Sequence, residues 1–555
     1  MQKLVDIFGY LAVLLSAGTL VGQSFLLGGL VFMYWIARPS AQIPAASLQR
    51  VHTLARRWFQ MAAIGLAVVQ VLYLYVNSAV LMATVEISFR EVTGANFFIA
   101  GSIILVASVN AAIVAGYGCP TQSRNEWAIK YSGWYLAFLV VVILSASVMT
   151  DHAASRIEGR VPLILLTATH EIASGLWIGG LPFLLLGLYV NRDRTTQWYL
   201  TRRFSRLAFA SVIAIVFSGL CMSVAYVGSF HALLGTSYGL MLLAKVAMLG
   251  ALLALGGVNF LMLRRYGPDQ VIPRLRRLVE AEVGIGITVL LSAASMTSAP
   301  PAVDLVNDVV QPSHIWARYR PVLPRMTSPP ESELSTKRPG QKISADDPTR
   351  RIVAYTSEGL GVSQRTLNDM KWSEYNHHWM GVIVLAMGIL AVLARTGRAP
   401  WAEYWPLLMI GIAIFIFLRG DPECWPLGPK PFWATWAQPE IAQHRAAAIL
   451  CIAFAIFELR VRRDPSHQGL LPLIFPLICA VGAALLLTHS HGTSNVREET
   501  LAELSHTPMA VVGVMAGWSR WLELRLPEED RGYASWIWPV CFVIIGAALL
   551  NYREF

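Results

Sequence analysis

Residues 95–117 read ANFFIAGSIILVASVNAAIVAGY and contain no charged side chain. A helix needs roughly 20 apolar residues to cross a hydrocarbon core about 30 Å thick, so this stretch predicts a membrane-spanning helix. Comparable stretches recur along the chain, and we expect about fourteen spans in an all-α polytopic membrane protein. They lie near residues 7–36, 59–83, 95–117, 129–149, 162–190, 204–228, 238–263, 279–299, 378–394, 401–418, 441–459, 470–488, 505–519 and 535–551.

The composition supports the same fold class. Hydrophobic residues make up 55% of the chain and charged residues only 14%, whereas a soluble protein carries about 25% charged residues. Most side chains must therefore contact membrane lipid or other apolar helices. The net charge of +10 does not predict nucleic-acid binding, because the basic residues are scattered over short loops instead of forming one stripe with aromatic residues.

The basic loops predict the orientation in the membrane. Lys and Arg concentrate in alternate loops, for example at Arg56, Arg57, Arg202, Arg203 and Arg277, and such loops face the cytoplasm. With an even number of spans, both termini are then periplasmic. Nothing in the sequence predicts the oligomeric state.

One change in composition divides the chain. Residues 300–376 are rich in Pro, Ser and charged residues, as at Pro300-Pro301 and Pro329-Pro330, and they lack an apolar period. We predict a periplasmic linker here, because so long a loop is unusual inside a compact domain. It would separate an eight-helix membrane domain (1–299) from a six-helix, histidine-rich membrane domain (377–555).

The histidines are distributed unevenly over this topology. All twelve except His52 and His467 fall on the predicted periplasmic side or in the outer half of a span. Histidine is rare in spans unless it faces the bundle interior, a cavity or a partner, and neutral imidazole is the commonest ligand of transition metals. We therefore expect metal sites on the periplasmic side.

In the first domain, histidine and methionine residues occur together near the predicted outer ends of helices. The candidate ligands are Met149, His152, His170, Met222 and Met296. Met149 and His152 share one face if their helix continues that far, and imidazole combined with thioether favours Cu(I). The alternatives are that Met222 and Met296 only fill the core, and that the two histidines bond to the backbone or to Glu171.

The second domain has a denser set of imidazoles at the ends of four helices, at one predicted height. These residues are His377, His378, His444, His489, His491 and His506. Three or four converging imidazoles would make a copper, zinc or haem site. The alternative is a group of interfacial histidines in contact with water and lipid headgroups.

Several ordered motifs are similar to one known family. They are His-Glu-Ile-Ala-Ser-Gly-Leu-Trp-Ile-Gly-Gly-Leu-Pro from His170, Arg-Phe-Ser-Arg-Leu-Ala from Arg203, Leu-Gly-Thr-Ser-Tyr-Gly from Leu234 followed by Lys245, and Arg-Leu-Val-Glu-Ala-Glu from Arg277 before Pro300-Pro301. Over residues 140–302 the chain resembles the copper resistance D family of bacterial inner-membrane proteins. The six-helix block lies outside the core pattern of that family.

The resemblance implies copper uptake or copper tolerance at the inner membrane, alongside a periplasmic copper carrier protein. It also implies that His152 and His170 match positions of an outward-facing copper site. No Gly-x-x-x-x-Gly-Lys-Ser/Thr motif is present, so we expect no pump driven directly by ATP. We expect a transporter and not an enzyme.

The alternative hypothesis is an electron-transfer protein that holds haem b or reacts with quinol. His378 or His444 would then be paired with His506 as axial ligands.

Overall fold

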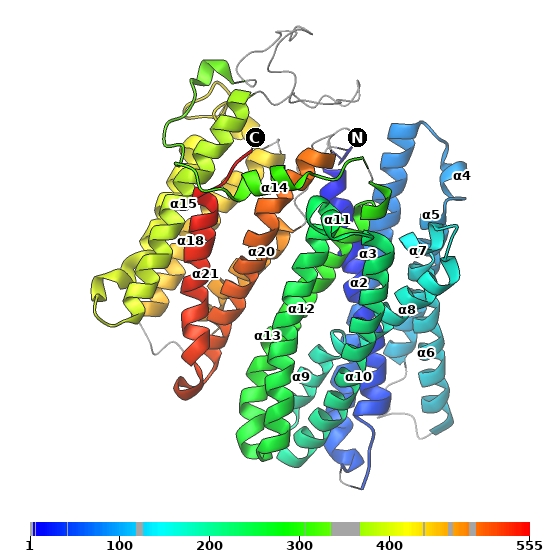
Figure 1. Ribbon diagram of the computed structural model, residues 1–555. Coiled ribbons are helices and arrows are strands. Elements are labelled where there is room, and N and C mark those ends of the chain that lie inside the picture. Colours follow the sequence, from blue (N-terminus) through cyan, green and yellow to red (C-terminus); the bar gives the residue numbers. More distant parts are fainter. Residues whose placement is uncertain are drawn as a thin grey trace. The chain divides into compact units, whose positions relative to one another are not determined.

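The computed structural model describes residues 4–5, 7–41, 43–117, 126–305, 307–334, 367–436, 439–463, 470–487 and 496–554. These ranges contain helices and no strand, which confirms the all-α fold class. Within them, eleven helices are long and apolar enough to cross a membrane, so the protein is a multi-pass membrane protein. The chain divides into two compact units, Met1–Leu233 with Met241–Val306, and Leu234–Leu240 with Asn307–Phe555 (Figure 1).

The first unit is built from long helices and short connecting helices. They are α2 (Phe8–Val31) with a π-helical turn at Phe32–Ile36, α3 (Ala45–Val85), α4 (Phe89–Val92), α5 (Asn96–Tyr117), α6 (Glu126–Val148), α7 (His152–Ser155), α8 (Arg160–Trp177), α9 (Leu181–Val190), α10 (Arg194–Val227), α11 (Phe230–Gly235), α12 (Ser237–Arg265) and α13 (Pro268–Ser298). Helix α2 packs against α3, α8 and α13, and α8 also packs against α10.

Glycine allows the closest of these contacts. A side chain at Gly179, between α8 and α9, would collide with the backbone of Ser24 on α2, and one at Gly28 would collide with the backbone of Gly179. Glycine is suited to such positions because it has no Cβ atom. This contact holds α8, which carries His170, against α2.

Helix α3 is longer than the predicted span at 59–83, because it begins at Ala45. The added turns are amphipathic and bury Leu48 and Val51. Arg56 is also buried, and its guanidinium donates to the carbonyl oxygens of Val114 and Ala115, both at 2.8 Å, at the end of α5. These bonds satisfy carbonyls that a helix end leaves without partners.

The second unit contains a further group of helices. They are α14 (Pro312–Tyr319), α15 (Leu367–Arg395), a 3₁₀ helix at Pro400–Leu407 that continues into α16 (Leu408–Phe415), α17 (Phe432–Thr435), α18 (Pro439–Arg463), α19 (Ile474–Leu486), α20 (Val496–Arg525) and α21 (Gly532–Leu550). Helix α21 packs between α15 and α20, and α20 also packs against α19 (Figure 1). Gly388 and Gly546 let α15 and α21 approach closely, since a side chain at either would meet the partner helix backbone.

A buried ion network joins several helices of the second unit, including α15, whose Arg395 pairs with Glu523. Arg520 of α20 donates to Glu458 of α18 and to Glu523, both at 2.7 Å, and the indole of Trp538 on α21 donates to Glu523 at 2.6 Å. Glu458 is fully buried. Charges inside a membrane protein require such partners, and this network supplies them for Glu458, Arg520 and Glu523.

The predicted count of about fourteen spans stays a prediction. Eleven of the predicted stretches coincide with the eleven candidate spans in the described ranges. Of the other three, 441–459 and 505–519 fall within α18 and α20, and 470–488 overlaps α19. The Leu471–Leu486 segment is an apolar helix shorter than a full span. The predicted periplasmic position of both termini and the 1–299, 300–376 and 377–555 division also stay predictions.

Candidate metal-binding sites

In the first unit, helices α8 and α10 hold His170 in a defined orientation. The His170 Nδ1 atom lies 3.1 Å from Ser218 Oγ, and the Ser218 hydroxyl itself donates to the Ala214 carbonyl at 2.6 Å. His170 Nδ1 is therefore the donor to Ser218, which leaves the lone pair on Nε2. A hydrogen bond to the other ring nitrogen is typical of histidines that bind metal ions.

Met222 lies on the same pair of helices, one turn toward the predicted periplasmic end. The Thr167 hydroxyl of α8 donates to the Met222 sulfur of α10 at 3.5 Å. Thr167 precedes His170 by three residues and Met222 follows Ser218 by four, so the thioether lies about one 5.4 Å turn outward of the imidazole. Thioether and imidazole are thus stacked along one interhelical seam.

A pair of carboxyl groups adjoins this seam. The Asp151 and Glu171 side chains are hydrogen-bonded to each other, and the Gln23 amide of α2 donates to Glu171 at 3.4 Å. Two carboxyl groups share a hydrogen bond only when one of them carries a proton. Burial raises the pKa of Asp151, although the charges of His152 and Lys245 oppose this.

His152 begins α7, directly after Asp151. Its Nε2 atom is buried and has no hydrogen-bond partner, which is unusual for a buried polar atom. Helix α6 ends at Val148, so the helix does not continue from Met149 to His152 and the premise of a shared helical face is wrong. A turn at residues 149–150 intervenes, and Met149 is 47% exposed.

The second unit brings two of the predicted imidazoles together. The rings of His377 on α15 and His506 on α20 lie 6.0 Å apart between centroids, nearly perpendicular to each other. Tyr552, which follows α21, stacks on His377 at 3.8 Å and lies edge-on to His506 at 5.7 Å. We call His377 and His506 the imidazole pair of the second unit.

Two other predicted ligands have different surroundings. His378 accepts a hydrogen bond at Nδ1 from the Arg325 backbone N–H at 2.7 Å and donates from Nε2 to the Tyr552 carbonyl at 2.9 Å. Both nitrogens are used within the protein, so this geometry does not support the predicted role of His378 as a ligand. His444 is half exposed and lies 2.9 Å from Asp421, while His489 and His491 fall outside the described residues.

No group of three or more His, Cys, Asp or Glu side chains with metal-binding geometry occurs in the described ranges.

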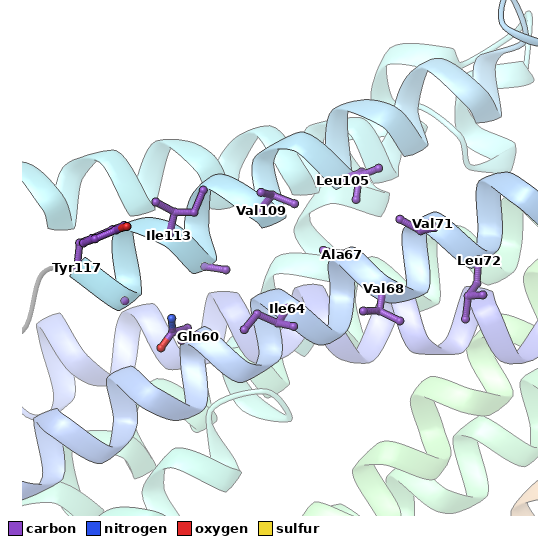
Figure 2. Close-up of a pocket in the computed structure, with 12 residues that line it drawn as sticks. Gln60, Ile64, Ala67, Val68, Val71, Leu72, Leu105, Val109, Ile113 and Tyr117 are labelled. Carbon is purple, nitrogen blue, oxygen red and sulfur yellow. The ribbon is translucent and has the colours of Figure 1, made fainter.

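A groove of about 710 Å³ lies between α3 and α5. It is lined by apolar residues such as Ile64, Val68 and Val109, with Gln60 and Tyr117 at one end (Figure 2). Its lining contains no imidazole, thiol or thioether, so it has none of the expected copper ligands.

A model of the copper resistance protein D family matches residues 198–296. Over these residues the chain is similar to that family. This confirms the predicted resemblance, and the matched stretch contains Ser218, Met222 and Lys245. The rest of the chain, including the imidazole pair of the second unit, lies outside this match.

A curated relative agrees with this assignment. The copper transport protein CutJ of Bacillus subtilis (strain 168) is 33% identical over 205 residues, which are 36% of this chain and 37% of the relative. The chain therefore aligns with little more than a third of the length of that relative. No solved structure matches the chain.

Sequence reasoning missed part of the polar cluster around His152 and His170. Asp151, Glu171, Gln23 and Lys245 were not predicted as site residues. Asp151 directly precedes His152, and Glu171 directly follows His170. That repeated doublet was the available signal. Met296, also a predicted ligand, is half-buried near the end of α13.

Proposed function

We propose that this protein carries copper across, or confers copper tolerance at, the bacterial inner membrane, with Cu(I) entering the first unit from the periplasm. The observation that carries the proposal is His170, whose Nδ1–H is held by Ser218 so that Nε2 presents its lone pair. The similarity to the copper resistance D family and the name of the CutJ relative support copper as the cargo.

The order of side chains along α8 and α10 supports a path for the ion. Met222 and the buried Nε2 of His152 would receive Cu(I) first, and His170 would take it one helical turn deeper. Imidazole and thioether are ligands that suit Cu(I). Met149 and Met296 stay candidate ligands at the periplasmic end.

The carboxyl pair supplies the charge that a cation needs. Asp151 and Glu171 share a hydrogen bond and therefore hold a proton between them. Release of that proton would leave negative charge beside the arriving copper ion. Lys245, whose charge acts on both Asp151 and His170, would compensate the carboxylate while copper is absent.

A periplasmic copper carrier protein is the proposed donor of the ion, and transport without enzymatic chemistry is the proposed activity. Copper would then move down a gradient or through ligand exchange. Surrounding membrane lipid is the remaining proposed partner, and the bacterial inner membrane is the location typical of the copper resistance D family.

Copper content and the visible spectrum of the detergent-purified protein test this function. We expect about one or more copper ions per chain, a clear decrease in His170→Ala, and no change in His231→Ala, which removes another histidine of the same unit. An unchanged copper content in His170→Ala would contradict the proposal. A Soret band that disappears in His506→Ala, in a protein without copper, would favour the haem b alternative.

A further inference from the structure

Two histidines of the second unit have the same hydrogen-bond arrangement. His377 Nδ1 lies 2.8 Å from the Ser373 carbonyl, and His506 Nδ1 lies 2.8 Å from the Ala502 carbonyl. A carbonyl oxygen can only accept, so each Nδ1 carries the hydrogen and each neutral ring has its lone pair on Nε2. Both imidazoles are therefore fixed in the tautomer that ligates through Nε2.

The spacing of the two rings suits a shared ion. With metal–nitrogen bonds of about 2.0 to 2.1 Å, two imidazoles bound to one ion have ring centroids roughly 5 to 6.5 Å apart. The observed separation between His377 and His506 is 6.0 Å. The neighbouring His378 cannot take part in this arrangement, because Arg325 and Tyr552 occupy its two nitrogens.

A carboxylate accompanies the pair. Glu554 accepts hydrogen bonds from the hydroxyl groups of Ser373 and Tyr552, and its charge acts on both His377 and His506. Arg318 holds the same segment by donating to the carbonyl oxygens of Arg553 and Glu554. The negative charge of Glu554 therefore acts on the two imidazoles and also on the Arg318 guanidinium.

We propose that His377 and His506 bind one Cu(I) ion in the second unit, at a site separate from the His152 and His170 site. Two neutral imidazoles can coordinate this monovalent ion, and Glu554 balances its charge. The identity of the ion rests on the proposed function of the first unit. The competing interpretation is that His377, His506 and Tyr552 form only an aromatic contact.

The test uses the full-length protein in detergent, in a His152→Ala/His170→Ala background. Titration with Cu(I) from a chromophoric chelator buffer should show about one bound ion per chain. Adding His377→Ala or His506→Ala should weaken binding by ten-fold or more, whereas His444→Ala should leave it unchanged, because that histidine is half exposed and paired with Asp421. Unchanged Cu(I) binding in both His377→Ala and His506→Ala would overturn the proposal.

A second measurement covers the possibility that these variants fold poorly. Copper K-edge absorption of the His152→Ala/His170→Ala protein should show imidazole nitrogen ligands and no sulfur, and a sulfur shell would contradict the assignment. The two sites can fail separately. If His170→Ala leaves copper unchanged in the wild-type background while His377→Ala removes it, the proposed entry site falls and the imidazole pair stands.

Discussion

His377 and His378 are neighbours in the sequence, yet their imidazoles have different hydrogen-bond partners. His378 is held on both nitrogens by residues far away in the chain, Arg325 and Tyr552. His377 bonds through Nδ1 to the carbonyl four residues earlier on its own helix. The sequence predicted histidines at this end of the bundle, but the tautomer of each one depends on tertiary contacts that no local pattern encodes.

Asp151 provides a prediction at the same scale. Burial raises its pKa, so the proton stays bound to higher pH than on an exposed carboxyl, and copper must compete with it. We expect Cu(I) affinity to fall as pH decreases through that raised pKa, by up to about ten-fold per pH unit for one displaced proton. Glu171, Lys245, His152 and Tyr226 surround this group and share its titration.

Asp151→Asn should make the pH dependence of Cu(I) affinity shallower, since the replaced side chain no longer releases a proton. The measurement is a series of chelator competitions between pH 5 and 8. Asp304→Asn is the matched control, because it removes an acid of the same unit that is paired with Arg156 and 45% exposed. An equal pH slope in wild type and Asp151→Asn would rule out this role for Asp151.

At the scale of the helices, the length of each apolar stretch in the sequence predicted where spans occur but not where the helices begin. Helix α3 starts well before its apolar stretch, because Arg56 finds partners on α5. Helix α13 likewise begins at Pro268 rather than near 279, since Val271, Ile272 and Leu275 are buried. Amphipathic turns of this kind carry charges, and a search for uninterrupted apolar residues passes over them.

The ion network between α18, α20 and α21 gives a prediction for these elements. Glu458→Ala should lower the free energy of unfolding by about 3–5 kcal/mol, because it leaves the buried Arg520 without one of its carboxylate partners. Thermal unfolding in detergent measures the change. Glu528→Ala is the control, since its side chain is 91% exposed and should shift stability little. Similar melting temperatures for the two variants would show that the network contributes little.

For the molecule as a whole, helix length and charge predict which side faces the periplasm. Helix α15 rises about 27 Å from His377 to Arg395 at 1.5 Å per residue, close to the thickness of a hydrocarbon core. The predicted orientation places His377 outside and Arg395 inside. The predicted topology is accessible to sequence reasoning because it depends on composition, whereas the two proposed copper sites depend on contacts between distant residues.

Thiol labelling can test this orientation. A membrane-impermeant maleimide should label His314→Cys in intact cells stripped of their outer membrane, and should label Arg398→Cys only after permeabilisation. The native Cys424 should contribute little, because burial and the nearby Glu423 and Asp421 raise the pKa of its thiol to about 11 and keep it protonated at pH 7. The reverse labelling pattern would invert the topology.

The segment after α21 has a practical consequence for protein engineering. Tyr552 stacks on His377, and Arg318 holds the backbone of Arg553 and Glu554. A polyhistidine tag fused behind Glu554 would start next to His377 and would itself bind metal ions. Copper stoichiometry measured on protein that carries such a tag would then include the ions bound by the tag itself.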